Sequence, residues 1–331
     1  MPNQNKQLFE QMLKMRRKAM GAGNRKKSRI SKMPVMLYPL AVERSYGKAL
    51  TKIFKDFTDL VNSEISKEVL ENWIQEYKQD RADIANSNPV ARFFAVFKKD
   101  AFLEDLTTII SGLKLKSSSL FSSGSPARQL VSNTSINTAD FGKRQFLKFS
   151  KKVLGVDFIP DEPWEQKAID SWSQDNYNLI TNLADEYIKK INNKVSEGVR
   201  FGKSADEIRK DLKKINKNIS GYRAKLIARD QTGKLNGELT KRRMEDVGVE
   251  KYTWLTAGDE RVRPDHRKMS NKICRWDNSN VYSDDGKNWT SRPSSMQGLI
   301  PGQDIQCRCT AIPNMDDLYE EIDNQIIKEA A

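Results

Sequence analysis

Apolar residues recur at helical spacing through most of the chain. They stand three or four residues apart between 56 and 81 and again, with more Phe and Leu, between 89 and 114. The strongest pattern runs from 164 to 199, where a single helix would span about 50 Å at about 1.5 Å per residue. The pattern therefore predicts a mainly α-helical body built from long helices.

Polar residues at fixed offsets mark where these helices begin and end. Ser204 and Glu207 form a capping box, in which the hydroxyl and the carboxylate each accept a hydrogen bond from the other residue's backbone N–H. A short helix is expected to follow. Ser220 is then expected to cap a longer helix that continues to Asp246 and stops at Gly248.

The composition and the hydrophobic pattern of the chain change after this helix. Residues 252–256 alternate as a short strand does, and the rest of 250–313 is rich in Gly, Pro, Asn, Asp and Ser. The segment predicts a small α+β module with loop-rich strands, and residues 316–331 predict a surface helix. A module this small buries little apolar area per residue, so a cross-link such as a bound metal ion would stabilise it.

The expected domain organisation follows from these patterns and from two compositional shifts, a basic start and a Ser-rich stretch in the middle. We divide the chain into a basic flexible arm (1–32), an N-terminal helical region (33–116), a Ser-rich linker (117–135), a helical body (136–249), a C-terminal module (250–315) and a tail helix (316–331).

Positive charge is concentrated at the beginning of the chain. The net charge is +13, and residues 1–32 carry ten Lys and Arg against the single acid Glu10, a net +9 that leaves only +4 for the rest. Such an arm can neutralise phosphates without having a fold, although it can equally be a solvated tail. The candidate nucleic-acid-binding residues are Lys14, Arg16, Arg17, Lys18, Arg25, Lys26, Lys27 and Arg29.

Composition argues against a membrane protein and against a disulfide-rich secreted one. Charged residues make up 31% of the chain and the mean hydropathy is −0.70. No apolar run approaches the roughly 18 residues of a membrane helix, and no apolar segment follows the first basic residues as in a secretory signal. Three cysteines, two of them in a C-x-C, make a poor disulfide framework, so we expect the reducing cytoplasm of the producing cell.

The chain keeps its soft metal ligands in one place. His266 is the only histidine, and the three cysteines Cys274, Cys307 and Cys309 lie within the same C-terminal segment. Thiolate and imidazole are the ligands that zinc prefers, and a C-x-C can place two thiolates on one ion if the middle residue projects away. His266, Cys307 and Cys309 are therefore candidate zinc ligands, and zinc is the one cofactor that we expect.

The fourth ligand of such a site stays open at this point. Cys274 could supply it, and so could the carboxylates of Asp259 or Asp265. The alternative to a metal is that the thiols are small buried hydrophobes, as free cysteines commonly are, and that His266 is a hydrogen-bonded turn residue.

Charged residues before the histidine invite two interpretations. Asp259, Arg261, Arg263 and His266 could form an acid/base site for a phosphate-bearing substrate, or the arginines could lock a loop through ion pairs. We favour the ion pairs, because the chain has no H-E-x-x-H, G-x-S-x-G or phosphate-binding P-loop motif and no paired-carboxylate spacing. The sequence therefore does not predict an enzyme.

A set of short motifs resembles one known family when taken in order. The motifs are Tyr222-Arg-Ala-Lys-Leu-Ile-Ala-Arg229-Asp-Gln-Thr-Gly-Lys-Leu-Asn236, Gly248-Val-Glu-Lys-Tyr-Thr-Trp254, Asp259-Glu-Arg-Val-Arg-Pro-Asp-His266, Trp276-Asp-Asn278, Pro301-Gly302 and Cys307-Arg-Cys309. This set resembles the phage Mu F-like head morphogenesis proteins, also called minor head or minor capsid proteins. The resemblance covers residues 165–313, about half the chain, and none of the motifs falls in residues 1–110.

Structural roles are assigned to the motif residues outside the zinc set. We expect Arg229 to reach the C-terminal module and Asp230, next to it on the same helix, to face solvent. The structural residues are Arg229, Asp230, Trp254, Asp259, Arg261, Arg263, Trp276 and Arg308.

The resemblance implies a virion protein of a tailed bacteriophage. Family members associate with the portal and the scaffold early in head assembly and have been linked to DNA packaging or ejection. It thus implies the portal and capsid or scaffold proteins as partners, a place in the capsid interior or at the portal vertex, and the host cytoplasm during assembly. DNA would be contacted through the basic arm.

Two other functions remain open from the sequence. The C-terminal module could be a metal-assisted enzyme or toxin-like effector that enters the host with the genome. The chain could also be a nucleic-acid-binding adaptor that has no place in the virion.

Overall fold

The chain folds into two compact units, each assembled from separate stretches of sequence. The computed structural model describes residues 4–21, 33–66, 71, 106–201 and 203–330. Unit 1 consists of Met1–Glu43, Thr134–Trp172 and Arg229–Ala331, and unit 2 consists of Arg44–Asn133 and Ser173–Ala228.

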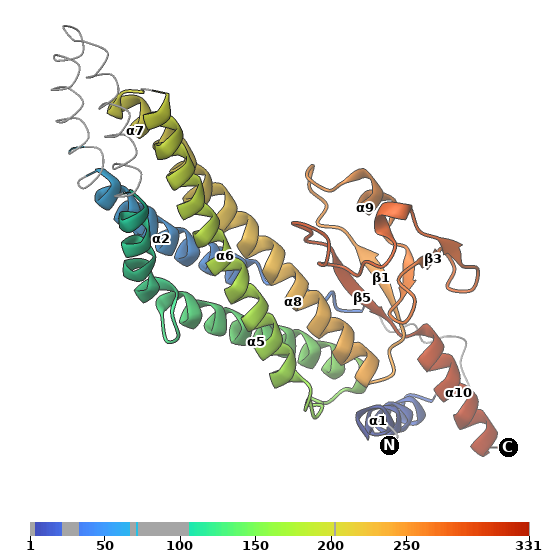
Figure 1. The fold of residues 1–331 in the computed structure, drawn as a ribbon. Helices are drawn as coiled ribbons and strands as arrows, with labels where there is room; N and C mark the ends of the chain where they lie inside the picture. The colour runs from blue at the N-terminus through green and yellow to red at the C-terminus, as the bar shows by residue number, and fades with distance from the viewer. Residues whose placement is uncertain (1–3, 22–32, 67–70, 72–105, 202, 331) are drawn as a thin grey trace, which may run out of the picture. The chain divides into compact units, whose positions relative to one another are not determined.

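Helices make up most of the described residues, as the sequence predicts (Figure 1). Residues 106–121 are helical as well. The other helices are α1 (Gln4–Ala19), α2 (Leu40–Glu64), α5 (Pro126–Leu154), α6 (Glu165–Arg200), α7 (Ala205–Lys217), the π-helical η2 (Asn218–Arg223), α8 (Ala224–Asp246), α9 (Pro264–Lys268), the 3-10 helix η3 (Ser294–Met296) and α10 (Asp316–Ala330). The predicted long helix is α6. Of the two predicted amphipathic stretches near the N-terminus, residues 67–70 and 72–105 lie outside the described residues.

The helix start predicted at Ser204 is confirmed, but the one predicted at Ser220 is wrong. Ser204 Oγ accepts from the Glu207 N–H at 3.3 Å, and Glu207 Oε2 accepts from the Ser204 N–H at 2.8 Å, which completes the capping box. Ser220 instead lies inside η2, and α7, η2 and α8 follow one another without a break. Leu212 and Ile219 are both buried, so packing of the apolar face outweighs a weak local helix breaker.

The predicted Ser-rich linker, 117–135, is also largely helical. Helix 106–121 covers its first part, α5 covers its last part, and only 122–125 separate them. Ser125 Oγ accepts from the Arg128 N–H at 3.3 Å and so caps α5. Three serines lie at the end of the preceding helix, Ser117, Ser118 and Ser119, and each hydroxyl donates to the carbonyl oxygen three residues back. These hydrogen bonds let the serines remain helical.

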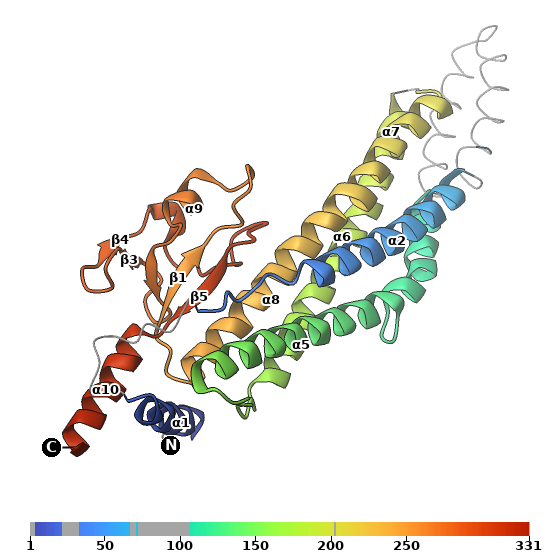
Figure 2. The same ribbon diagram turned by 180° about the vertical axis from the view of Figure 1, so that it is seen from behind.

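The first half of the predicted basic arm, 1–32, is an ordered part of unit 1. Phe9 and Leu13 stand one turn apart on α1 and are fully buried. The Phe9 ring lies 6.2 Å from that of Phe149 and 5.5 Å from that of Phe158, and α1 packs beside α10 (Figure 2). An i, i+4 apolar pair thus anchors a segment whose charge alone predicted a flexible tail; residues 22–32 lie outside the described residues.

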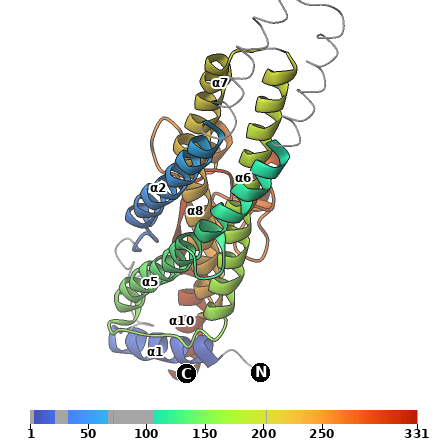
Figure 3. The same ribbon diagram turned by 60° about the vertical axis from the view of Figure 1, so that its left-hand side comes forward.

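Unit 2 is almost entirely helical in its described part (Figure 3). Aromatic side chains join its helices. The ring of Phe57 lies 5.2 Å from that of Phe121 and 5.3 Å from that of Tyr187, both in edge-on arrangements. Close by in sequence, Tyr46 is buried and its hydroxyl accepts from Asn176 Nδ2 at 2.8 Å. Aromatic pairing and one satisfied polar contact therefore link α2 to α6.

Unit 1 holds the predicted α+β module, whose sheet is antiparallel with the strand order β4-β3-β2-β1-β5. The strands are β1 (Lys251–Leu255), β2 (Ile273–Arg275), β3 (Val281–Ser283), β4 (Thr290–Ser291) and β5 (Thr310–Asn314). β1 lies between β2 and β5, and its partners in β5 run from Lys251↔Asn314 to Leu255↔Thr310. Alternate residues of both strands are buried, so one face of the sheet forms a core.

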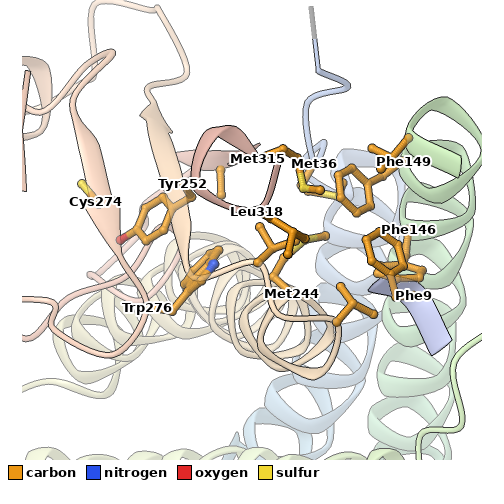
Figure 4. Close-up of a cluster of buried hydrophobic side chains, with 14 of the residues drawn as sticks. Phe9, Met36, Phe146, Phe149, Met244, Tyr252, Cys274, Trp276, Met315 and Leu318 are labelled. Atoms are coloured by element: carbon orange, nitrogen blue, oxygen red, sulfur yellow. The ribbon is translucent and has the colours of Figure 1, made fainter. Parts of the chain in front are cut away.

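One apolar core joins this sheet to helices distant in sequence (Figure 4). Tyr252 on β1 stacks on Trp276 with ring centroids 3.9 Å apart. The same cluster includes Phe9, Phe149 and Leu318, which belong to α1, α5 and α10. The module therefore does not depend on its own small interior alone, because helices from both ends of the sequence extend its core.

A buried guanidinium forms a second tie within unit 1. Arg243, on α8, is 1% exposed, and its Nε and Nη2 lie 2.7 Å from carboxylate oxygens of Glu162 and Glu165 respectively. A Cβ at residue 142 would lie 2.3 Å from Arg243 Nη1, so Gly142 leaves the space that the guanidinium fills.

Replacing this guanidinium should therefore be costly. We expect Arg243→Ala to lower the free energy of unfolding by about 3–5 kcal/mol, because Glu162 and Glu165 would be left without their buried partner. Urea unfolding followed by tryptophan fluorescence measures the loss. The control is Arg242→Ala, which removes an exposed pair with Glu238 and should cost less than about 1 kcal/mol. Equal losses for the two variants would contradict the buried pair's role.

Candidate metal centre

The only imidazole of the chain and both thiols of the C-x-C meet at one point. His266 Nδ1 lies 3.4 Å from Cys309 Sγ and 3.6 Å from Cys307 Sγ. All three side chains are buried, and their ligand atoms lie within 4.8 Å of one another. The structure thus brings together the three residues that the sequence nominated as zinc ligands.

Sheet topology accounts for this meeting. Thr310, the first residue of β5, pairs with Leu255, the last residue of β1, so the loop after β1 and the loop before β5 leave the sheet at the same end. Cys309 immediately precedes β5. The loop after β1 leads into α9, which begins at Pro264 and carries His266 in its first turn. Antiparallel pairing therefore brings together residues 43 positions apart.

Hydrogen bonding makes the two thiols unequal. A hydrogen bond from the Cys309 thiol, together with bonds from His266 and from the backbone N–H groups of Cys309 and Gly302, lowers the pKa of Cys307 to about 5. Sharing that proton raises the pKa of Cys309 above its ordinary value, with burial acting in the same direction. The hydrogen bond with Cys307 likewise raises the pKa of His266, against the effect of burial.

A carboxylate that the sequence analysis missed orients the imidazole. Asp304 Oδ2 lies 2.8 Å from His266 Nε2 and also pairs with Arg263 Nη1. The other carboxylate oxygen accepts from the Ile305 N–H at 2.7 Å. Nδ1 is thereby left facing the sulfurs. One signal was available, because Asp304 is the only acidic residue between 286 and 315.

The arginines of the motif form the ion-pair network that we favoured over a catalytic site. Arg261 Nη2 lies 2.9 Å from Asp259 Oδ2, and hydrogen bonding by this guanidinium lowers the pKa of the Asp259 carboxyl. Arg263 pairs with Asp304, and Arg308 Nη1 lies 3.9 Å from Asp259 Oδ2. The network joins the loop after β1 to the loop before β5.

None of the three alternatives for a fourth ligand reaches the cluster. Cys274 lies on β2 in the apolar core beside Tyr252 (Figure 4), and burial raises the pKa of its thiol to about 11. The Asp265 carboxylate accepts from Ser295 and Lys268 instead. Among the described residues, only His266, Cys307 and Cys309 bring metal-binding atoms together here.

The contact predicted between Arg229 and the C-terminal module is present. Arg229 Nη1 donates to Gln306 Oε1 at 3.1 Å, and its Nε donates to Glu43 Oε1 at 3.2 Å. The same Glu43 oxygen accepts from Arg308 Nη2 at 3.4 Å, so the middle residue of the C-x-C projects away from the thiols. Glu43 lies in the first turn of α2 and is buried; no sequence motif pointed to it.

The expectation that Asp230 faces solvent is wrong. Its side chain is 8% exposed, and it accepts from the Gln306 N–H at 3.2 Å and from Lys234 Nζ at 2.8 Å. Gly233 explains the difference, because its missing side chain lets the loop before β5 lie directly on α8. A Cβ there would be 3.0 Å from the carbonyl oxygens of Cys307 and Gly302.

A second glycine one turn further on makes the approach still closer. A Cβ on Gly237 would lie 2.4 Å from the Pro301 carbonyl oxygen. Gly302 has φ +94, and a Cβ at that position would lie 2.4 Å from the Gly233 carbonyl oxygen. The helix and the loop therefore touch backbone to backbone, which sets the path of the chain into the C-x-C.

The two motif tryptophans belong to the core of unit 1. Trp254 is fully buried on β1, and its ring lies 5.9 Å from that of His266 in an edge-on arrangement. Trp276 is 3% exposed and stacks on Tyr252. Trp254 thus forms one wall beside the imidazole, while Trp276 supports the sheet.

Four of the candidate nucleic-acid-binding residues have contacts within unit 1. Lys14 and Lys18 pair with Glu329, and Arg17 pairs with Asp323, both on α10. Arg16 donates to two carbonyl oxygens at the end of α5. The other four, Arg25, Lys26, Lys27 and Arg29, lie outside the described residues.

A cavity of about 300 Å³ opens beside the His/Cys cluster. Four guanidinium groups and one carboxylate face it, together with the three candidate ligands. Its lining residues are Arg229, Ala257, Asp259, Arg261, Val262, Arg263, His266, Gln306, Cys307, Arg308 and Cys309. The arrangement favours a small anion next to a soft cluster of sulfur and nitrogen.

None of the described helices is both long enough and apolar enough to cross a bilayer.

Comparison with known proteins finds one family that is similar to much of this region. Residues 189–312 match the family described as Phage Mu protein F like protein. The chain is 30% identical over 180 residues to an uncharacterized protein of Haemophilus influenzae. The aligned segment covers 54% of this chain and 37% of that protein. The chain is 29% identical over 175 residues to an uncharacterized protein of Methanocaldococcus jannaschii, covering 52% and 24% respectively. The similarity thus spans less than two fifths of either relative, and no solved structure matches.

The glycine contact on α8 can be tested by adding a single methyl group. We expect Gly237→Ala to destabilise the protein by about 1–3 kcal/mol or more, because the new Cβ would meet the Pro301 carbonyl oxygen. Gly221→Ala is the matched control, since no atom lies within 4 Å of the added Cβ; it should be neutral or stabilise by up to about 1 kcal/mol. Thermal and urea unfolding measure both, and equal stability of the two variants would exclude the close approach.

Proposed function

We propose that this protein is a minor head protein of a tailed bacteriophage, because residues 189–312 match the Phage Mu protein F like family. The family match is the observation that carries the proposal. It extends from the second half of α6 to β5, so it contains the α8–loop contact and the whole His/Cys cluster. The protein would act in head morphogenesis, in the capsid interior or at the portal vertex, and would be made in the host cytoplasm.

The geometry favours a structural role for the motif arginines. Arg229 and Arg308 share Glu43, while Arg261 and Arg263 pair with acidic residues of the same module. Each guanidinium therefore already has a partner in its own chain. Such a network fixes loops, which suits a component that presents a stable surface to a portal, capsid or scaffold protein.

DNA contact is the second part of the proposal. The basic residues on α1 pair with α10 or cap the end of α5, so they contribute to the fold of unit 1. The contact with DNA would then depend on four positive charges in five positions, those of Arg25, Lys26, Lys27 and Arg29. They would neutralise phosphates during packaging or ejection of the genome.

One observation favours a different function for the C-terminal module. Two cysteines, an imidazole and four arginines line the same cavity, as in a metal-assisted enzyme or toxin-like effector. That function predicts that His266→Ala keeps the stability of the protein and abolishes an activity. A structural cluster predicts that the same substitution lowers the melting temperature.

A direct test of the head function uses particles of the phage that encodes the chain. We expect the protein in purified virions, at few copies relative to the major capsid protein, and in DNA-free procapsids together with the portal protein. Quantitative mass spectrometry of both particles measures this. Its absence from both, with free protein in the lysate, would refute the proposal and favour a nucleic-acid-binding adaptor outside the virion.

The DNA contact has its own prediction. Replacing Arg25, Lys26, Lys27 and Arg29 by Gln should reduce the slope of log K against log salt by about 3 to 4, since each neutralised phosphate contributes about 0.9. Gel shifts with duplex DNA across a salt series measure the slope. The control replaces Lys14 and Lys18 by Gln, which should leave the slope unchanged because both lysines pair with Glu329. If the Lys14 and Lys18 replacement reduced the slope and the other replacement did not, the DNA-binding site would lie on α1.

A further inference from the structure

We propose that His266 Nδ1, Cys307 Sγ and Cys309 Sγ bind one zinc ion, and that its fourth coordination position opens into the arginine-lined cavity. The site is independent of the head function proposed above, since it follows from the geometry of these side chains. Its fourth ligand would be water or an oxygen of a small anion.

The two distances from the imidazole nitrogen to the sulfurs fit a tetrahedral ion. With Zn–S bonds of about 2.3 Å and Zn–N bonds of about 2.0–2.1 Å, a tetrahedral ion holds a bound nitrogen about 3.5 Å from a bound sulfur. The structure has Nδ1 at 3.4 Å from Cys309 Sγ and at 3.6 Å from Cys307 Sγ. Both separations match the edges of a zinc tetrahedron.

Hydrogen bonding alone explains this arrangement less well. A neutral imidazole nitrogen has either one proton or one lone pair, so Nδ1 can make a good hydrogen bond with only one of the two sulfurs. A cation placed between the three atoms interacts with all of them.

The surroundings of His266 select the nitrogen that binds. Asp304 Oδ2 lies 2.8 Å from Nε2, where it can accept a hydrogen bond from Nε2–H, and Asp304 is itself held by Arg263 and by the Ile305 N–H. With the proton held at Nε2, the lone pair of Nδ1 would face the sulfurs and could bind the ion. A carboxylate on the far nitrogen of a zinc-bound histidine is a recurrent arrangement that fixes the tautomer and strengthens the ligand.

The surroundings of the thiolates are equally suited to a metal. The Cys309 N–H lies 3.3 Å from Cys307 Sγ, and a backbone N–H of Gly302 also bonds to that sulfur. Arg308 projects away to Glu43, which leaves the two thiols on one side of the chain. Two thiolates balance the charge of Zn²⁺, so the bound site would be neutral overall.

The fourth position is open because no other described side chain supplies a ligand atom there. Asp259 faces the same cavity, but its carboxylate is taken by Arg261. Three protein ligands plus an exchangeable one is the coordination typical of reactive rather than purely structural zinc. The lining arginines would favour an anionic oxygen over a neutral one, and phosphate is the simplest probe.

The main experiment counts zinc in the full-length, untagged chain, purified under reducing conditions, loaded with zinc and freed of excess. Plasma mass spectrometry should find one zinc per chain. Cys307→Ser and Cys309→Ser should lose it, whereas Cys274→Ser, which removes a buried thiol outside the cluster, should keep it. Wild-type protein without zinc, or equal loss in all three variants, would overturn the site.

A second measurement needs no variant, because the chain has a single histidine. Nitrogen-15 NMR of His266 should show zinc at Nδ1 and a proton at Nε2; zinc at Nε2, or an unchanged imidazole, would refute the assignment. Asp304→Asn keeps the shape of the residue and should weaken zinc binding by about 10–100-fold, measured by competition with a chelator. Unchanged affinity would remove Asp304 from the site.

The open position is tested with cobalt in place of zinc. The ligand-field bands of the cobalt protein should change on titration with phosphate, and Arg261→Gln, which removes a lining guanidinium without touching the C-x-C, should weaken that response several-fold while leaving the metal content intact. A spectrum insensitive to phosphate and to other small anions would show that the fourth position is closed. A Cys307–Cys309 disulfide in freshly isolated protein, with no metal, would overturn the whole proposal.

Discussion

The structure of unit 1 depends on the close approach of α8 to the loop that precedes β5. Gly233 and Gly237 remove side chains from one face of the helix, and Gly302 takes a positive φ so that its backbone can meet it. This contact determines where Gln306 lies on α8, the direction of the C-x-C, and the distance between the C-x-C and His266. A helix–loop contact this close tolerates no Cβ, so the spacing of glycines is a structural requirement here.

Carboxylates organise the cations around this contact. Glu43 receives guanidinium groups from α8 and from the C-x-C, and Asp304 receives Arg263 while it orients the imidazole. These acids come from an α2 turn and a glycine-rich loop, distant from the arginines in sequence. All of these ion pairs form only when the segments of unit 1 have assembled. The network therefore stabilises the assembled unit and forms completely only in it.

Local periodicity predicted the parts of the fold that local interactions determine. The helical body, the capping box at Ser204 and the loop-rich strands depend on spacing, and they are present. The errors at Ser220 and in the Ser-rich stretch arose because packing of apolar faces outweighed weak helix breakers. The candidate ligands were predictable because they are chemically rare in this chain. The roles of Glu43 and Asp230 could not be predicted, and that of Asp304 had only a weak signal, because all three arise from tertiary contacts across 38 or more positions.

The pairing of α1 with α10 constrains how the molecule matures on the ribosome. Phe9 and Leu13 are buried in a core that also contains Leu318 and Ile322, and Arg17 meets Asp323. During synthesis, α1 can therefore be buried fully only after some 300 further residues have been added. During that interval α1 is available to chaperones or to a neighbouring nascent chain, and completion of unit 1 withdraws it.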